Sequence, residues 1–154
     1  MSFQPRHPDF ERRVRTSFAK QAAMRTIGAS LEGVTPGEVC VTMPFQADLT
    51  QQHGFVHAGV VTALVDSACG YAALSLMEAG AAVLSVEFKV QLLAPARGAW
   101  FRARGRVVRA GRTLTVVAGE LHAYAGENAR ENETLVALLN GTMMTVRDRP
   151  GLND

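Results

Sequence analysis

Cysteines, aromatic residues and long apolar runs are all scarce in this chain of 154 residues. The two cysteines, Cys40 and Cys69, have neither the spacing of a disulfide framework nor that of a metal site, and they fit a reducing compartment. No apolar run approaches the ~20 residues that a membrane span needs. The net charge of +2 is mild and implies no polyanionic partner, while 47% apolar residues suffice for the core of one domain.

The amino terminus lacks the apolar core of a secretory signal, so we expect a cytoplasmic protein. No linker or repeat divides the chain. We predict a helical extension over residues 1–26, one domain over 27–147 and a short tail over 148–154.

The region from Val60 to Met77 contains no proline and a single glycine, which predicts a long helix that ends near Gly80. Between Ala58 and Met77 the only charged residue is Asp66, so the usual division into an apolar and a charged face is missing. We therefore expect a helix that is covered on most sides. Its many small residues would let a sheet approach the helix backbone closely.

Asp66 has two interpretations. It is either a helix acid at a wet edge or paired with an arginine, or it is a carboxylate held in a cleft for work as a base or nucleophile. The first turn of the same helix favours the second interpretation. The N–H groups of Ala58 and Gly59 lack acceptors within the helix and lie at the positive end of its dipole, where they can stabilise an oxyanion.

The remaining elements follow from apolar periodicity and turn residues. Residues 8–25 show the pattern of an amphipathic helix, and a turn at Thr35-Pro36-Gly37 joins two short strands in a hairpin. Extended runs follow the long helix, near 82–94, 99–109, 112–125 and 133–146, with a polar separator over 126–132. We predict an α+β fold in which an antiparallel sheet, with these four strands in meander, curls round one central helix.

The segment Gln51-Gln-His-Gly54-Phe-Val-His57-Ala-Gly59, followed by Leu64-Val-Asp66-Ser-Ala-Cys-Gly70, resembles the hotdog-fold acyl-CoA thioesterases of the PaaI-like, phenylacetate-pathway type. The likeness extends from about residue 27 to 146. It implies that Asp66 is the catalytic carboxylate, acting on water or attacking the thioester carbonyl directly. It also implies that the amides of Ala58 and Gly59 form the oxyanion hole.

Further roles follow from the same resemblance. His57 would shape the oxyanion turn, Ser85 would help to place water, and Gln51 stands where relatives often carry an asparagine that binds the carbonyl or the nucleophile. Ala58 replaces the first glycine of a His-Gly-Gly turn, which keeps the amide and adds a methyl group. The resemblance assigns substrate binding, including the phosphates of CoA, to Gly54, Arg109, Gly111, Arg112 and Thr113.

Several of these residues have simpler interpretations. His53 and His57 are four residues apart, yet no third ligand completes a metal site, so we expect neither a metal nor a cofactor. Arg102, Arg104 and Arg106 alternate along one strand and are expected on a solvated outer face. Few aromatic residues accompany these arginines, which disfavours nucleic-acid binding.

Three functions remain open from the sequence. The first is hydrolysis of an acyl-CoA of unspecified acyl group, in a homodimer in which the acid of one subunit faces the oxyanion turn of the other, with two dimers forming a tetramer. The second is a hotdog hydroxyacyl dehydratase. The third is a protein that binds acyl-CoA without turning it over. We expect no membrane partner.

Overall fold

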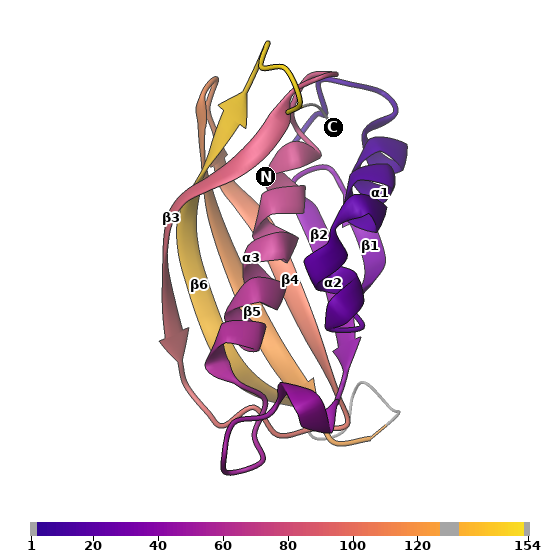
Figure 1. Cartoon of the computed structure of the whole chain (residues 1–154). Helices are drawn as coiled ribbons and strands as arrows, with labels where there is room; N and C mark the ends of the chain where they lie inside the picture. Colours follow the sequence, from indigo (N-terminus) through magenta and orange to yellow (C-terminus); the bar gives the residue numbers. More distant parts are fainter. Residues whose placement is uncertain (1–2, 127–132, 153–154) are drawn as a thin grey trace.

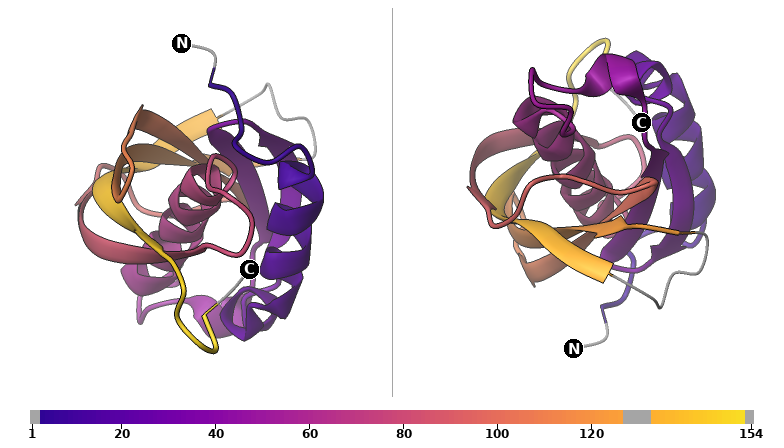
Figure 2. Two further views of the ribbon diagram at one scale, coloured as in Figure 1. Left: turned by 90° about the horizontal axis from the view of Figure 1, so that it is seen from above. Right: turned by 90° about the horizontal axis from the view of Figure 1, so that it is seen from below.

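One long helix lies inside a curled antiparallel sheet (Figures 1 and 2). The computed structural model describes residues 3–126 and 133–152. The central helix is α3 (Ala58–Leu74), and the sheet has the order β1-β2-β4-β5-β6-β3. Its strands are β1 (Ser30–Thr35), β2 (Glu38–Pro44), β3 (Ala82–Leu92), β4 (Trp100–Ala110), β5 (Leu114–Tyr124) and β6 (Glu133–Val146). The predicted α+β hotdog arrangement, the hairpin and the four later extended runs are confirmed.

The sheet approaches the helix backbone closely because glycines line the contact. A Cβ atom at Gly105 of β4 would lie 2.3 Å from the carbonyl carbon of Ala68, and one at Gly119 of β5 would lie 2.6 Å from Cys69 Sγ. Gly105 and Gly119 pair with each other across the two strands. The close approach expected from small helix residues is thus matched by missing side chains on the sheet.

The predicted meander of four strands is wrong for the first of them. β3 pairs with β6 at one edge of the sheet, and β4 pairs with β2 near the other edge. The segment 93–99 makes this crossing at the end of the molecule where α3 begins. There the Leu93 N–H donates to Val136 O at 2.8 Å, and the Val56 N–H donates to Ala96 O at 3.1 Å.

The central helix ends at Leu74, earlier than the predicted boundary near Gly80. Ser75 is fully buried, and its hydroxyl donates to Ala72 O at 2.7 Å and accepts from the Gly37 N–H at 2.8 Å. The next two N–H groups bond to carbonyls three residues back. A buried serine therefore tightens the chain into turns, which apolar periodicity does not reveal.

The predicted amphipathic helix over residues 8–25 is two helices, α1 (Phe10–Lys20) and α2 (Ala22–Thr26). Gln21 breaks them because its ψ of 99° is extended, and its N–H donates to Phe18 O at 3.0 Å. α1 packs beside α3, with Val14 fully buried and the ring of Phe18 edge-on to Tyr71 at 5.5 Å between centroids. A short 3-10 helix, η1 (Ala47–Leu49), follows β2.

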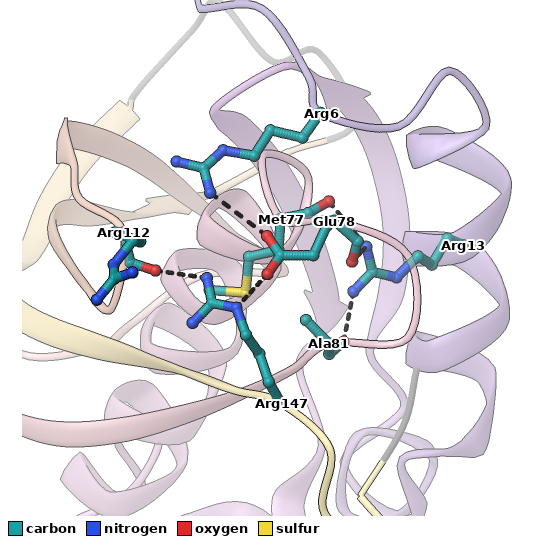
Figure 3. Close-up of polar contacts among 7 residues, drawn as sticks. All are labelled: Arg6, Arg13, Met77, Glu78, Ala81, Arg112 and Arg147. Atoms are coloured by element: carbon teal, nitrogen blue, oxygen red, sulfur yellow. Dashed lines mark hydrogen bonds and ion pairs between the residues drawn. The ribbon is translucent and has the colours of Figure 1, made fainter.

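One arginine fixes α1 to the loop between α3 and β3. Arg13 donates to the carbonyls of Met77, at 3.0 Å, and Glu78, at 2.7 Å, and also to that of Ala81 (Figure 3). The Glu78 carboxylate also binds Arg6 and Arg147. The contacts of Arg13 thus join α1 to the loop that follows the end of α3.

Within the described ranges, no helix is long and apolar enough to cross a membrane. Most of the polar separator predicted over 126–132 lies outside the described residues.

Candidate active site

One stripe of α3 is left open by the sheet. Ala58 and Gly59 are exposed and Thr62, Ala63 and Asp66 are half-buried, whereas most of the helix beyond Asp66 is buried. These five residues recur at helical spacing and so share one side of the helix. Asp66 is therefore neither in open solvent nor in the core, as expected of a carboxylate in a cleft.

His57 caps the start of α3. Its backbone is extended, and its Nδ1 accepts a hydrogen bond from the Gly59 N–H at 2.9 Å. That bond uses one of the two amides predicted for the oxyanion hole. The Ala58 N–H, at the first helical position, has no acceptor within the helix and is the donor that remains for a substrate oxygen.

The preceding loop is held by Gln51. Its side-chain oxygen accepts from the His53 N–H, and its backbone binds Phe55 O at 2.8 Å and the Gly54 N–H at 3.0 Å. Gly54 has a φ of +81°, a conformation that favours glycine. Both carbonyl oxygens of Gln51, that of the side chain and that of the backbone, therefore accept hydrogen bonds within the turn. Gly54 supplies its left-handed bend.

A mainly apolar cavity of about 390 Å³ adjoins this turn. It lies between the loop, the start of α3 and the segment that follows β3. Its lining includes Gln51, Phe55, Ala58, Val61, Leu92 and Val136. The guanidinium of Arg97 lies over the ring of Phe55, one of these lining residues, 5.5 Å from its centre.

Asp66 accepts a hydrogen bond from Ser85, the residue that the resemblance assigned to placing water. Ser85 Oγ, on β3, donates to Asp66 Oδ1 at 2.9 Å. Burial raises the pKa of Asp66, and the hydrogen bond from Ser85 opposes that rise. A carboxylate with a raised pKa is a stronger base than an exposed aspartate once it is ionised.

The Ala58 amide and Asp66 of one chain cannot act on the same carbonyl group. They are eight positions apart on a continuous helix, which corresponds to ~12 Å along its axis at 1.5 Å per residue. A nucleophile and the oxyanion donors must both lie about 3 Å from one reacting group. The chemistry predicted from the sequence is therefore incomplete within a single copy.

The turn predicted to bind phosphates lies near the opposite end of α3. Arg109 ends β4 together with Ala110, Thr113 precedes β5, and a Cβ atom at Gly111 would lie 2.2 Å from Leu114 O. The Arg112 carbonyl accepts from Arg147 at 2.6 Å, which ties the turn to Glu78 beyond the end of α3 (Figure 3). Both arginine side chains at this turn are exposed.

The alternating arginines of β4 lie on the outer face of the sheet, as predicted. Arg102 pairs with Glu32 at 2.8 Å and Arg104 with Glu38 at 2.7 Å, while the residues between them are buried. These two arginines are neutralised locally. No group of three metal-ligating side chains occurs in the part of the chain that the structure describes.

Sequence reasoning missed the contribution of α1 to the site. Ser17 and Gln21 line a pocket of about 200 Å³ together with Asp66 and Ser85. The apolar pattern over 8–25 predicted one continuous helix, and nothing in the residue pattern marked the break at Gln21.

The family model of the thioesterase superfamily matches residues 53–129, half of the chain. A predicted esterase of Halobacterium salinarum is 32% identical over 127 residues, covering 79% of this chain and 83% of its own. The crystal structure of a thioesterase family protein from Silicibacter pomeroyi matches with a TM-score of 0.85 and 48% identity, covering 90% of this chain and 98% of that one. The Escherichia coli PaaI protein of the phenylacetic acid degradation operon matches with a TM-score of 0.77 and 22% identity, over 94% and 96% of the two chains.

The chain therefore belongs to the thioesterase superfamily. Membership supports hydrolysis of thioesters or esters, while the likeness to PaaI concerns the fold.

Proposed function

We propose that this protein hydrolyses acyl-CoA thioesters at sites formed between two copies of the chain. The observation that carries the proposal is the separation of ~12 Å, along one helix, between a cleft carboxylate and the free amide at the helix start. A second copy with its helix antiparallel supplies the missing half, because Asp66 of one copy then faces Ala58 of the other.

The free edge of the sheet supports this pairing. β3 is the last strand in the sheet order, so one of its edges has no strand partner in the described part of the chain. Leu84, Val86 and Phe88 on this strand are 40%, 53% and 43% exposed. An exposed apolar edge strand favours pairing with a second strand, and a two-fold pairing would be antiparallel. Two such dimers are proposed to form a tetramer.

In this site the thioester oxygen accepts a hydrogen bond from the Ala58 N–H of one copy. Asp66 of the other copy either attacks the carbonyl carbon or removes a proton from an attacking water. The carbon–sulfur bond then breaks, and the CoA thiolate takes up a proton. If Asp66 is the nucleophile, water then hydrolyses the mixed anhydride, which releases the free acid and restores the carboxylate. The apolar cavity beside Ala58 is proposed to hold the acyl group, and Arg109 and Arg112 are proposed to bind phosphates of CoA.

A panel of aromatic, short, medium and long acyl-CoAs tests the proposal through release of free CoA thiol. We expect turnover of at least one member and much slower cleavage of the matching oxygen esters. Saturable binding of the whole panel with no thiol release would replace the proposal with a binding protein. Formation of an enoyl-CoA product would point to a dehydratase.

Ser85→Ala is expected to move the acid limb of the pH–rate profile to higher pH. The hydrogen bond from Ser85 stabilises ionised Asp66, so its loss raises the pKa of Asp66 further and delays formation of the active carboxylate. The activity lost near neutral pH should be partly regained at alkaline pH. Ser30→Ala, at an exposed position of β1, serves as the control, and an unmoved limb would argue against the Ser85 role.

A further inference from the structure

A small polar pocket lies beside Asp66, away from the oxyanion turn. It has a volume of about 200 Å³, enough for more than one water molecule. α1 and the residue that follows it form one wall, β3 forms another, and α3 forms the floor. Its polar lining comprises Ser17, Gln21, Asp66, Ser67, Tyr71 and Ser85. The apolar cavity beside Ala58 is separate and shares no lining residue with it.

Gln21 lines this pocket and carries an acceptor that has no hydrogen-bond partner among the described residues. Its Nε2 lies 3.5 Å from Ser67 Oγ, while its Oε1 is buried without a hydrogen-bond partner among the described residues. Burying an acceptor without a donor is destabilising, so this oxygen favours a ligand that donates a hydrogen bond. Gln21 and the Asp66 carboxylate line the same pocket.

The element that carries Gln21 is firmly held. Arg13 fixes α1 to three carbonyl groups of the loop after α3 (Figure 3). Val14 and Phe18 of the same helix are buried in the core. The break at Gln21 then directs its side chain toward α3 instead of along the helix surface. A side chain on a braced element can hold a small ligand in a fixed position.

We infer that Gln21 is a positioning residue that, together with Asp66, holds the hydrolytic water; the inference rests on the proposed thioesterase function. The water donates one hydrogen to the Asp66 carboxylate and the other to Gln21 Oε1. A lone pair of the water oxygen is then directed out of the pocket, toward the thioester carbonyl carbon. Ser85 binds Asp66 Oδ1 and so leaves Oδ2 for the water.

This arrangement assigns Asp66 as the general base. The water oxygen forms a bond to the carbonyl carbon while its proton passes to Asp66. The carbon–sulfur bond breaks with its electron pair on sulfur, and the proton held by Asp66 returns to the thiolate. The products are the free acid and CoA, and no covalent acyl-enzyme forms.

Gln21→Leu tests the role by removing the acceptor while keeping a side chain of similar length. We expect kcat for the best acyl-CoA substrate to fall by about 10- to 100-fold, the cost of misplacing a reacting group, with KM changed less than about twofold. Gln4→Leu, the same substitution at an exposed position, should leave both constants unchanged. A normal kcat, or a change confined to KM, would overturn the inference.

Two further readouts separate positioning of water from a structural role. Gln21→Glu keeps an acceptor oxygen but adds a negative charge near Asp66, which should move the acid limb of the kcat profile to higher pH. A single turnover of wild type in water labelled with ¹⁸O should leave the peptide containing Asp66 unlabelled. An unmoved limb, or ¹⁸O in that peptide, would refute the inference while thiol release still upheld the thioesterase. Absence of thiol release from wild type would instead refute both.

Discussion

Replacing Asp66 with asparagine should lower kcat for acyl-CoA hydrolysis by about 10²- to 10⁴-fold, the usual contribution of a positioned acid–base group. Asparagine has nearly the same shape and can still accept the hydrogen bond from Ser85. Affinity for CoA should therefore stay within a few-fold of wild type. Steady-state thiol release and equilibrium binding of CoA measure the two effects separately.

The same variant should be more stable than wild type at neutral pH. Because burial raises the pKa of Asp66 in the folded chain, ionisation of Asp66 disfavours the fold. The protonated form of Asp66 is the one that the fold favours. The stability that it contributes is fully present below the unfolded-state pKa and is lost as the pH rises through the folded-state pKa. We expect Asp66→Asn to raise the Tm by about 2–4 °C at neutral pH, a modest change because the group is partly screened by solvent.

The difference in Tm between Asp66→Asn and wild type should disappear at acidic pH, where Asp66 of wild type is itself protonated. Asp48→Asn, at an exposed position in η1, is the matched control and should change neither activity nor Tm. A variant of Asp66 that kept its activity would remove this residue from the chemistry. A lower Tm at neutral pH would show instead that the carboxylate stabilises the fold.

Ala58→Pro should lower kcat by about 10²- to 10³-fold, the typical loss when one oxyanion donor is removed. Proline has no N–H, and the first position of a helix tolerates it well. The extended backbone of His57, with φ −61° and ψ 139°, is also what a residue before proline requires. The substitution thus deletes the free donor with little effect on the helix.

Ala58→Gly separates the amide from the side chain. It keeps the N–H and removes the methyl group that borders the apolar cavity, so kcat should stay within a few-fold while the preferred acyl group changes. Circular dichroism and thermal melts check that both variants fold. An Ala58→Pro protein that folds and retains wild-type turnover would exclude the Ala58 amide from catalysis.

Local chemistry made much of this fold predictable. The lone charge of Asp66 in a helix of small residues indicated both a covered helix and a cleft acid, and alternation located the strands to within two or three residues. The resemblance in motif singled out Ser85 as a residue that helps to place water, and the structure shows its hydroxyl bonded to Asp66 at 2.9 Å, a contact that the sequence had not indicated.

The remaining features depend on contacts between distant residues. The pairing of β3 with β6 comes from a connection that crosses one end of the molecule, and no local pattern records it. The early end of α3 depends on Ser75 reaching Gly37, and the capture of the Gly59 amide depends on the rotamer of His57. Gln21 was missed because its role follows from a break in a helix that periodicity describes as continuous.

Mixing two inactive variants tests the shared site most directly. Asp66→Asn and Ala58→Pro are unfolded together and refolded so that subunits combine at random. If the carboxylate of one copy works with the amide of the other, each mixed dimer contains one intact site, and activity should return to roughly a quarter of the wild-type level. If both groups act within one chain, no mixed dimer has an intact site, and a mixture as inactive as its components would contradict the account.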